Sequence, residues 1–106
     1  HVPEYKRKDK LSCYHLYPLR IKGVTEAQRN AIIKEIFDQD VSVNVHFIPV
    51  PMMSFYKKQG YDIKNYPVTF DNYSREISLP VYYDLTDDKV KRVIDAVNIA
   101  VKKVMG

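Results

Sequence analysis

The chain has 106 residues, of which 45% are hydrophobic and 28% charged, a composition typical of a globular domain and one that argues against extensive disorder. This length corresponds to one domain at most, and no apolar run is long enough to cross a membrane. The single cysteine excludes an internal disulfide and a cysteine-based zinc or iron–sulfur site, and the net charge of +4 favours anionic partners only weakly.

The first ten residues are rich in lysine and arginine and contain little that could pack. We interpret residues 1–10 as a solvated linker, with an arm that contacts phosphate groups as the alternative. The run from Leu11 to Ile21 is rich in aromatic and apolar residues and predicts a β-strand, which Gly23 closes. Because Pro18 has no N–H to donate, this strand should lie at a sheet edge or carry a bulge.

A helix is predicted over residues 25–39. Thr25 and Gln28 have the spacing of a capping box, in which the threonine hydroxyl accepts a hydrogen bond from the backbone N–H three residues later. Apolar side chains then recur at helical spacing: Ala31, Ile32, Ile33, Ile36 and Phe37.

Residues 41–50 alternate between apolar and other side chains, and the alternation predicts a β-strand that Pro49 and Pro51 end. One face would hold Val41, Val43, Val45 and Phe47 and pack on the preceding helix. The opposite face carries Asn44 and His46, and we expect something polar or functional to cover it.

The remaining elements are shorter, apart from the last. Residues 52–60 predict a short helix that Gly60 ends, residues 61–70 a tyrosine-rich turn, residues 71–76 a helical turn and residues 77–81 a short strand. Residues 86–104 predict a helix with Thr86 at the N-cap and an apolar stripe: Val90, Val93, Ile94, Val97, Val101 and Val104.

This order of elements predicts an α+β fold: a small three-stranded, mostly antiparallel sheet, with the helices at 25–39 and 86–104 on one face. Two helices do not cover both faces, so the open face should meet another domain or subunit. The predicted core is Val43, Val45, Ile36, Val93, Ile94 and Val97.

The residues offer little for an enzyme that acts alone. There is no G-x-S-x-G motif, and three glycines are too few for a glycine-rich phosphate loop. Cys13 and His15 share a strand face without indicating a nucleophilic pair, and the histidines lack metal-ligand spacing. Asp87 and Asp88 indicate a helix N-terminus and not a catalytic pair. From alternation alone, His46 is either a half-exposed histidine without a task or part of the wall of a ligand or interdomain cleft.

Three motifs together resemble a known family. Residues 12–20 (SCYHLYPLR) are similar to the S-x-Y-H-L-Y-x-x-R strand that opens the small C-terminal domain of the sugar-nucleotide aminotransferases, the DegT/StrS group of fold-type I pyridoxal-phosphate enzymes. Residues 43–50 (VNVHFIPV) resemble the V-x-V-H-Y-I-P-V strand of that family, with Phe47 where tyrosine is commoner. Residues 77–82, followed by Leu85 and Thr86, resemble its S-L-P-L-Y-P-x-L-T ending. The motifs occur in the family's order across residues 11–104.

The resemblance implies an enzyme that transfers an amino group, usually from glutamate, to a keto-sugar linked to a nucleotide, for polysaccharide or related biosynthesis. Its cofactor is pyridoxal 5'-phosphate (PLP). The family's Schiff-base lysine and most phosphate contacts lie in a large N-terminal domain, so residues 1–10 would be the linker from that domain and residues 11–106 the small domain. By itself the small domain should be inactive. The full-length enzyme is expected to be a cytoplasmic homodimer, and no signal peptide is visible.

In the family, the small domain walls the active-site cleft and helps to receive the nucleotide-sugar. By position, His46 and Phe47 match this wall, with Tyr14 and His15 as weaker candidates; no catalytic, cofactor or metal ligand is assigned to this chain. Phe47 in place of tyrosine lacks the phenolic hydroxyl. His46 is expected to bind the sugar-nucleotide and not to act as the base, which in this family is the Schiff-base lysine.

Two other classes stay open. A ferredoxin-like small-molecule or protein-binding module without catalysis would have a similar order of helices and strands. A nucleic-acid binder would use the basic N-terminal segment and the tyrosines, but acidic residues are interspersed throughout the chain, so we expect neither nucleic acid nor a membrane as a partner.

Overall fold

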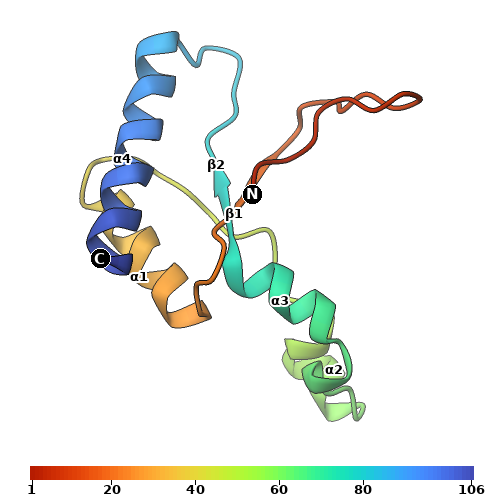
Figure 1. Ribbon diagram of the computed structural model, residues 1–106. Coiled ribbons are helices and arrows are strands. Elements are labelled where there is room, and N and C mark those ends of the chain that lie inside the picture. The colour runs from red at the N-terminus through yellow and green to blue at the C-terminus, as the bar shows by residue number, and fades with distance from the viewer.

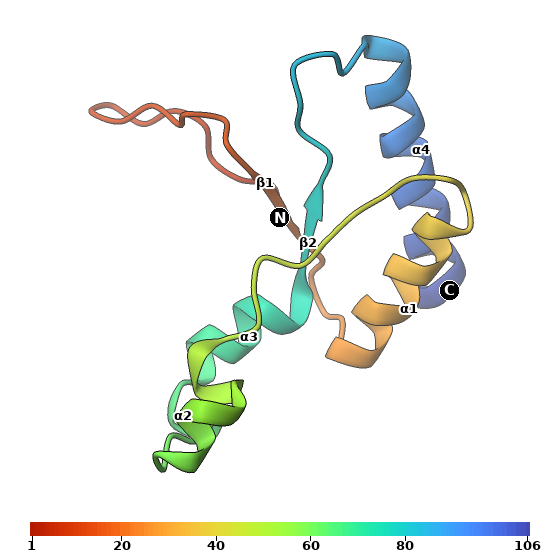
Figure 2. The same cartoon turned by 180° about the vertical axis from the view of Figure 1, so that it is seen from behind.

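The computed structural model describes residues 1–106. Its elements are β1 (Tyr17–Arg20), α1 (Glu26–Phe37), the 3-10 turn η1 (Val50–Met52), α2 (Ser54–Lys58), the 3-10 turn η2 (Ile63–Asn65), α3 (Pro67–Arg75), β2 (Glu76–Leu79) and α4 (Asp87–Met105). Figures 1 and 2 show α1 and α4 side by side on one side of the two strands, whereas α2, α3 and the N-terminal segment extend to the other. The predicted α+β class, with the long helices on one face, is confirmed.

The sheet has two strands and not the predicted three. β1 and β2 are antiparallel, with Tyr17 opposite Leu79 and Arg20 opposite Glu76. Pro18 lies opposite Ser78, whose backbone N–H and C=O both pair with Asn44 on the other side. The missing N–H of Pro18 therefore leaves no ladder bond unmade, in agreement with the predicted edge position.

The strand predicted for residues 41–50 is wrong beyond a single bridge between Asn44 and Ser78. The backbone N–H groups that follow donate to side chains: that of Val45 to the side-chain oxygen of Asn44 at 2.8 Å, and that of His46 to the carboxylate of Glu76 at 3.1 Å. Side chains that hydrogen-bond to the backbone compete with the ladder. Val41 and Val43 nevertheless enter the core, so the alternation is right for the first half of the segment.

The predicted strand at residues 11–21 forms only from Tyr17 onward. Residues 11–16 instead fold back on the basic segment, with a bridge between Lys6 and Leu11 and a backbone hydrogen bond from Ser12 to Tyr5 at 2.8 Å. This hairpin projects from the molecule and its side chains stay largely exposed (Figure 1). Pairing with the basic segment thus replaces pairing with the sheet at Leu11 and Ser12, and the positive φ of Tyr14 interrupts the extended backbone before β1.

The helices largely follow the prediction. In α1 the capping box forms: the N–H of Gln28 donates to the Thr25 hydroxyl at 3.2 Å, and that of Thr25 donates to the Gln28 side chain at 2.9 Å. The short α2 is followed by Gly60 at φ +89°, which only glycine adopts easily. The turn predicted for residues 61–70 is wrong in its second half, because Pro67 begins α3, and proline is well tolerated in a helix's first turn. No helix is both long and apolar enough to span a bilayer.

The core lies where α1, α4 and β2 meet. Its buried apolar residues are Val24, Ile32, Ile36, Val41, Val43, Ile77, Ala96, Val97 and Ala100. Of the predicted core, Ile36, Val43 and Val97 are confirmed, Val93 is half-buried against it, and Val45 is half-buried outside it. Ile94 is wrong, with 51% of its surface exposed, because the alanines at 96 and 100 face α1 and turn Ile94 out of the contact.

Candidate functional site

A hollow of about 430 Å³ lies on the sheet face that the two long helices leave open. Alternate residues of a strand point to opposite faces. Leu19 and Ile77 therefore pack toward the helices, whereas Pro18, Arg20 and Glu76 line the hollow. The loop after Asn44 and helix α3 complete its wall with His46, Phe47, Pro49, Thr69, Asn72 and Tyr73.

His46 lines this hollow, and its two ring nitrogens differ in their surroundings. The residue is half-buried, and its Nδ1 is covered by the protein without a hydrogen-bond partner. Nε2 is not among the buried unpaired atoms, so it is the ring nitrogen of His46 that is available for a hydrogen bond with a ligand.

Phe47 forms the outer wall of the hollow. Its side chain is 70% exposed, and its ring lies edge-on to that of His46, with 4.6 Å between the ring centroids. An exposed aromatic ring beside a hydrogen-bond donor is a surface that suits a sugar or another polar ring with one apolar face.

The buried carboxylate of Glu76 holds the loop in place. Only 7% of the residue is exposed. One carboxylate oxygen accepts from the backbone N–H of His46 at 3.1 Å, and the other accepts from the hydroxyl of Ser78. The sequence placed Glu76 in a helical turn without a role; the only signal for it is a charged residue directly before an apolar strand.

Arg29 supports the same wall from behind. It is only 1% exposed, its Nη1 donates to the carbonyl of Glu76 at 3.0 Å, and its guanidinium lies 4.9 Å from the centroid of the Tyr73 ring. Glu26 balances its charge at 3.7 Å. Burial raises the pKa of the Tyr73 hydroxyl and Glu26 raises it further, while Arg29 opposes the shift. Sequence reasoning missed Arg29, although it occupies a position one turn before Ile32 in the apolar stripe of α1.

Arg20 is a second cation that the sequence analysis did not single out. Its guanidinium reaches the hollow and donates to the side-chain oxygen of Asn72. The side-chain nitrogen of Asn72 donates in turn to the carbonyl of Val68 at 2.8 Å. The signal that could have found it is its place as the last residue of the first motif.

The structure does not bring the four predicted site residues together. His46 and Phe47 lie together in the hollow. Tyr14 lines a different hollow, also of about 430 Å³, with Tyr17 and Val81, and His15 is exposed and lines neither. Of the four residues that were expected to contact the sugar, only His46 and Phe47 therefore lie in one hollow.

The residues of this chain do not fit PLP as a covalently held cofactor. A Schiff base requires a lysine that lines a walled site. Every lysine of the chain is exposed, and none lines the hollow of His46 and Phe47. No step of the chemistry is therefore assigned to PLP on these residues.

A family model for the DegT/DnrJ/EryC1/StrS aminotransferases matches residues 1–98, which include the whole hollow. The chain belongs to this aminotransferase family. The ferredoxin-like binding module, which the order of elements alone left open, is not supported by this match.

Curated relatives point in the same direction. The chain is 34% identical to the spore coat polysaccharide biosynthesis protein SpsC of Bacillus subtilis, over 95% of this chain and 27% of SpsC. It is 43% identical to an uncharacterized protein of Methanocaldococcus jannaschii, over 88% of this chain and 24% of that protein. A transaminase of Aneurinibacillus thermoaerophilus named for dTDP-3-amino-3,6-dideoxy-α-D-galactopyranose is 26% identical over 85% of this chain and 23% of its own length.

Among solved structures, the chain is similar to the apo form of Spr1654 of Streptococcus pneumoniae, designated a sugar aminotransferase, with a TM-score of 0.96 and 33% identity over 99% of this chain and 26% of that one. The PLP form of the same protein gives a TM-score of 0.95 and 34% identity over 98% of this chain. The chain thus spans about a quarter of the length of the relatives that it matches.

Proposed function

We propose that this chain is the small domain of a PLP-dependent sugar aminotransferase, which transfers an amino group from glutamate to a keto-sugar linked to a nucleotide. The observation that carries the proposal is the hollow walled by His46 and Phe47, in a fold that matches a quarter of a sugar aminotransferase with a TM-score of 0.96. The names of SpsC and of the Aneurinibacillus transaminase support a role in polysaccharide or amino-sugar biosynthesis.

In this proposal the chain binds the sugar-nucleotide and does not perform the proton transfers. Nε2 of His46 donates to a hydroxyl or phosphate oxygen, and the ring of Phe47 packs on the sugar. PLP, bound elsewhere in the enzyme, supplies the electron sink for amino transfer. Tyr14, in the second hollow, and His15, exposed outside both hollows, are secondary candidates for substrate contact.

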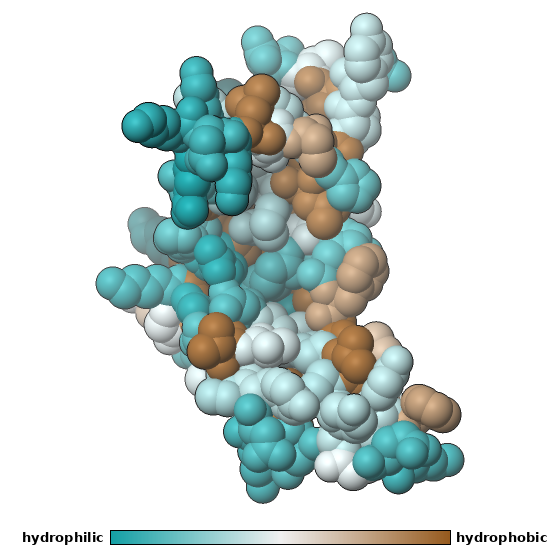
Figure 3. Space-filling model, turned by 90° about the vertical axis from the view of Figure 1, so that its right-hand side faces the viewer, coloured by the Kyte–Doolittle hydropathy of each residue, from teal (hydrophilic) through white to brown (hydrophobic).

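The rest of the enzyme would cover the face shown in Figure 3, which lies opposite α1 and α4. Hydrophobic side chains form separate patches among hydrophilic ones on this face. Large apolar residues exposed in the chain include Phe47 at 70%, Phe55 at 66% and Val68 at 74%. Such side chains suit contact with a large catalytic domain or with the second subunit of a cytoplasmic homodimer.

The test is His46→Ala in the full-length enzyme, with the glutamate half-reaction and the keto-sugar half-reaction measured separately. Loss of one hydrogen bond costs about 0.5–1.5 kcal/mol, or roughly 2- to 12-fold in affinity, and a charged phosphate partner would bring this toward 3 kcal/mol. The glutamate half should survive nearly intact, while KM rises for the sugar half. Phe47→Ala should act in the same direction.

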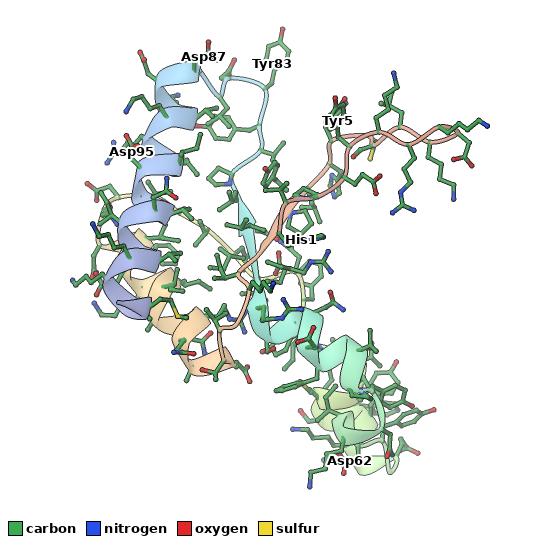
Figure 4. The ribbon with its side chains drawn as sticks, in the orientation of Figure 1. His1, Tyr5, Asp62, Tyr83, Asp87 and Asp95 are labelled. Carbon is green, nitrogen blue, oxygen red and sulfur yellow. The ribbon has the colours of Figure 1, made fainter.

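Three further variants complete the design. Tyr83→Ala removes an equally large aromatic side chain that is fully exposed on the loop before α4, and it should leave both half-reactions unchanged (Figure 4). Tyr14→Ala and His15→Ala test the two secondary candidates. Equal loss of both half-reactions in His46→Ala, with folding preserved, would place His46 in the chemistry and contradict the proposal.

A further inference from the structure

We infer that Arg20 recognises an anionic group in the hollow, the diphosphate of the nucleotide-sugar. The inference rests on the proposed function and goes beyond it, because it assigns the phosphate contact to a residue that was not among the four candidates for substrate binding. The argument depends on the charge, the anchoring and the surroundings of this one side chain.

The charge of Arg20 is not balanced by a close carboxylate. No carboxylate oxygen forms an ion pair with its guanidinium within 4.0 Å, whereas Arg7, Arg29, Arg75 and Arg92 each have one. Its side chain bonds only to the neutral amide oxygen of Asn72. A guanidinium has five N–H donors, so several remain for a ligand.

The side chain is also held ready on a well-anchored backbone. Arg20 pairs with Glu76 across the sheet on one side. On the other side it exchanges two backbone hydrogen bonds with His1, at 2.7 and 3.0 Å, and Figure 4 shows His1 beside β1. The hydrogen bond to Asn72 restrains the side chain itself, so little side-chain freedom is lost when a ligand binds, which favours affinity.

The one carboxylate of the hollow is engaged elsewhere. Glu76 faces the same space as Arg20, but both of its oxygens accept hydrogen bonds, from the His46 N–H and the Ser78 hydroxyl. The guanidinium of Arg29 donates to the backbone carbonyl of Glu76 and so adds a positive charge at this residue. An incoming anion would therefore meet the free donors of Arg20, with the ring of His46 in the same lining.

A diphosphate fits these donors better than a single carboxylate. The planar guanidinium binds two oxygens at once, and Arg is favoured where phosphate is recognised in this bidentate way. The hollow of about 430 Å³ is larger than a glutamate carboxylate needs, and its lining includes both Arg20 and the aromatic ring of Phe47, on which the sugar would pack. The carboxylate of the amino donor is the competing source of negative charge.

The experiment measures binding of UDP and dTDP to the full-length enzyme and its Arg20→Gln variant by calorimetry, with uridine and thymidine as uncharged probes. Arg20→Gln should weaken both diphosphates about 10- to 100-fold, as expected for a lost hydrogen bond between charged groups. It should leave the weak binding of the nucleosides unchanged. The dependence of diphosphate affinity on salt concentration should also become shallower.

Three other variants sharpen the result. Arg20→Lys keeps the positive charge but loses the planar guanidinium that binds two oxygens at once. Its affinity for the diphosphates should therefore lie between those of the wild type and Arg20→Gln. Asn72→Asp leaves Arg20 in place and sets a carboxylate against it, and should also weaken diphosphate binding. Arg92→Gln removes an exposed arginine of α4 that bonds to the carbonyl of Gln39, and should have no effect.

The outcomes separate this inference from the proposed function. Unchanged diphosphate affinity in folded Arg20→Gln overturns the inference, as does a raised KM for glutamate with unchanged diphosphate affinity. If Arg20→Gln does not fold, the diphosphate affinity of Asn72→Asp decides instead, and an unchanged affinity overturns the inference. If the full-length protein binds diphosphates through Arg20 but aminates no nucleotide-linked keto-sugar, the proposed function fails and the inference stands.

Discussion

The carboxylate of Glu76 accepts a hydrogen bond from the backbone N–H of His46 at 3.1 Å, which joins two segments 30 residues apart in the sequence. Apart from the bridge between Asn44 and Ser78, this is the contact that fixes the loop to β2 at the hollow. Because the carboxylate is buried, a lost partner is not easily replaced by water. The position of His46 therefore depends on a residue that does not itself need to touch a ligand.

Glu76→Gln is expected to weaken the attachment of the loop at His46 to β2 and to leave the hydrophobic core intact. Glutamine can keep its oxygen on the His46 N–H only by turning its amide donor to the Ser78 hydroxyl, which must then accept, and both bonds lose the negative charge of the carboxylate. The free energy of unfolding should fall by about 1–3 kcal/mol, and the His46 amide should exchange faster than the amides of α1. Glu4→Gln, on the exposed hairpin, is the control. Unchanged protection of the His46 amide would show that the clamp is not needed.

Two isoleucines should respond differently to truncation. Ile36→Ala removes a fully buried side chain between α1 and α4 and should cost about 2–5 kcal/mol in urea unfolding. Ile94→Ala, at 51% exposure, should cost less than about 1.5 kcal/mol, although its place in the stripe of residues 86–104 suggests a core residue. Equal losses in the two variants would mean that α4 is rotated relative to the structure.

The two helix N-caps should also differ. Thr25→Ala removes the hydroxyl that accepts from the Gln28 N–H, whereas the backbone N–H of residue 25 can still donate to the Gln28 side chain. The variant should lower stability by about 0.5–2 kcal/mol. Thr86→Ala should have a smaller effect, because the Thr86 side chain makes no capping bond in α4. Thermal unfolding of the two variants beside the wild type is the measurement, and a larger loss for Thr86→Ala would contradict the capping assignment.

Stability should depend on Tyr73 at high pH. The pKa of its hydroxyl is raised above the ordinary 10.0, first by burial and then by Glu26, against the opposing effect of Arg29. A raised pKa means that the folded chain holds the proton more tightly than the unfolded chain. This contribution is complete below pH 10.0 and is lost as the pH rises through the folded pKa.

The measurement is urea unfolding of the wild type and Tyr73→Phe from pH 8 to 11. The stability of the wild type should fall more steeply above pH 10.0 than that of the variant. Tyr83→Phe, which changes a fully exposed tyrosine, should follow the wild type. Parallel curves for all three proteins would show that Tyr73 titrates alike in the folded and unfolded chains.

The 106-residue chain alone should not bind PLP at a single site. With every lysine exposed, borohydride reduction after equimolar PLP should leave no lysine stoichiometrically modified, as peptide mapping would show. The full-length enzyme, treated in the same way, should be labelled at one lysine outside this sequence. Stoichiometric label on one lysine of this chain would overturn the division of labour proposed above.

The sequence by itself determined the features that depend on residues close together in the chain. The helix over residues 25–39 follows from the spacing of Thr25 and Gln28 and from the apolar period, and both act within one or two turns. The family resemblance likewise rests on contiguous motifs, and these motifs alone predict His46 and Phe47 as residues of the cleft wall.

Only the tertiary structure decided how distant segments share hydrogen bonds. Residues 41–50 have the alternation of a strand, yet Glu76, 30 residues farther along, takes the N–H of His46 and ends the pairing after Asn44. Arg20 and Asn72 meet across 52 residues. Such contacts depend on which side chains the fold brings together, and no local period or propensity encodes that. The hollow itself is therefore a property of the packed chain.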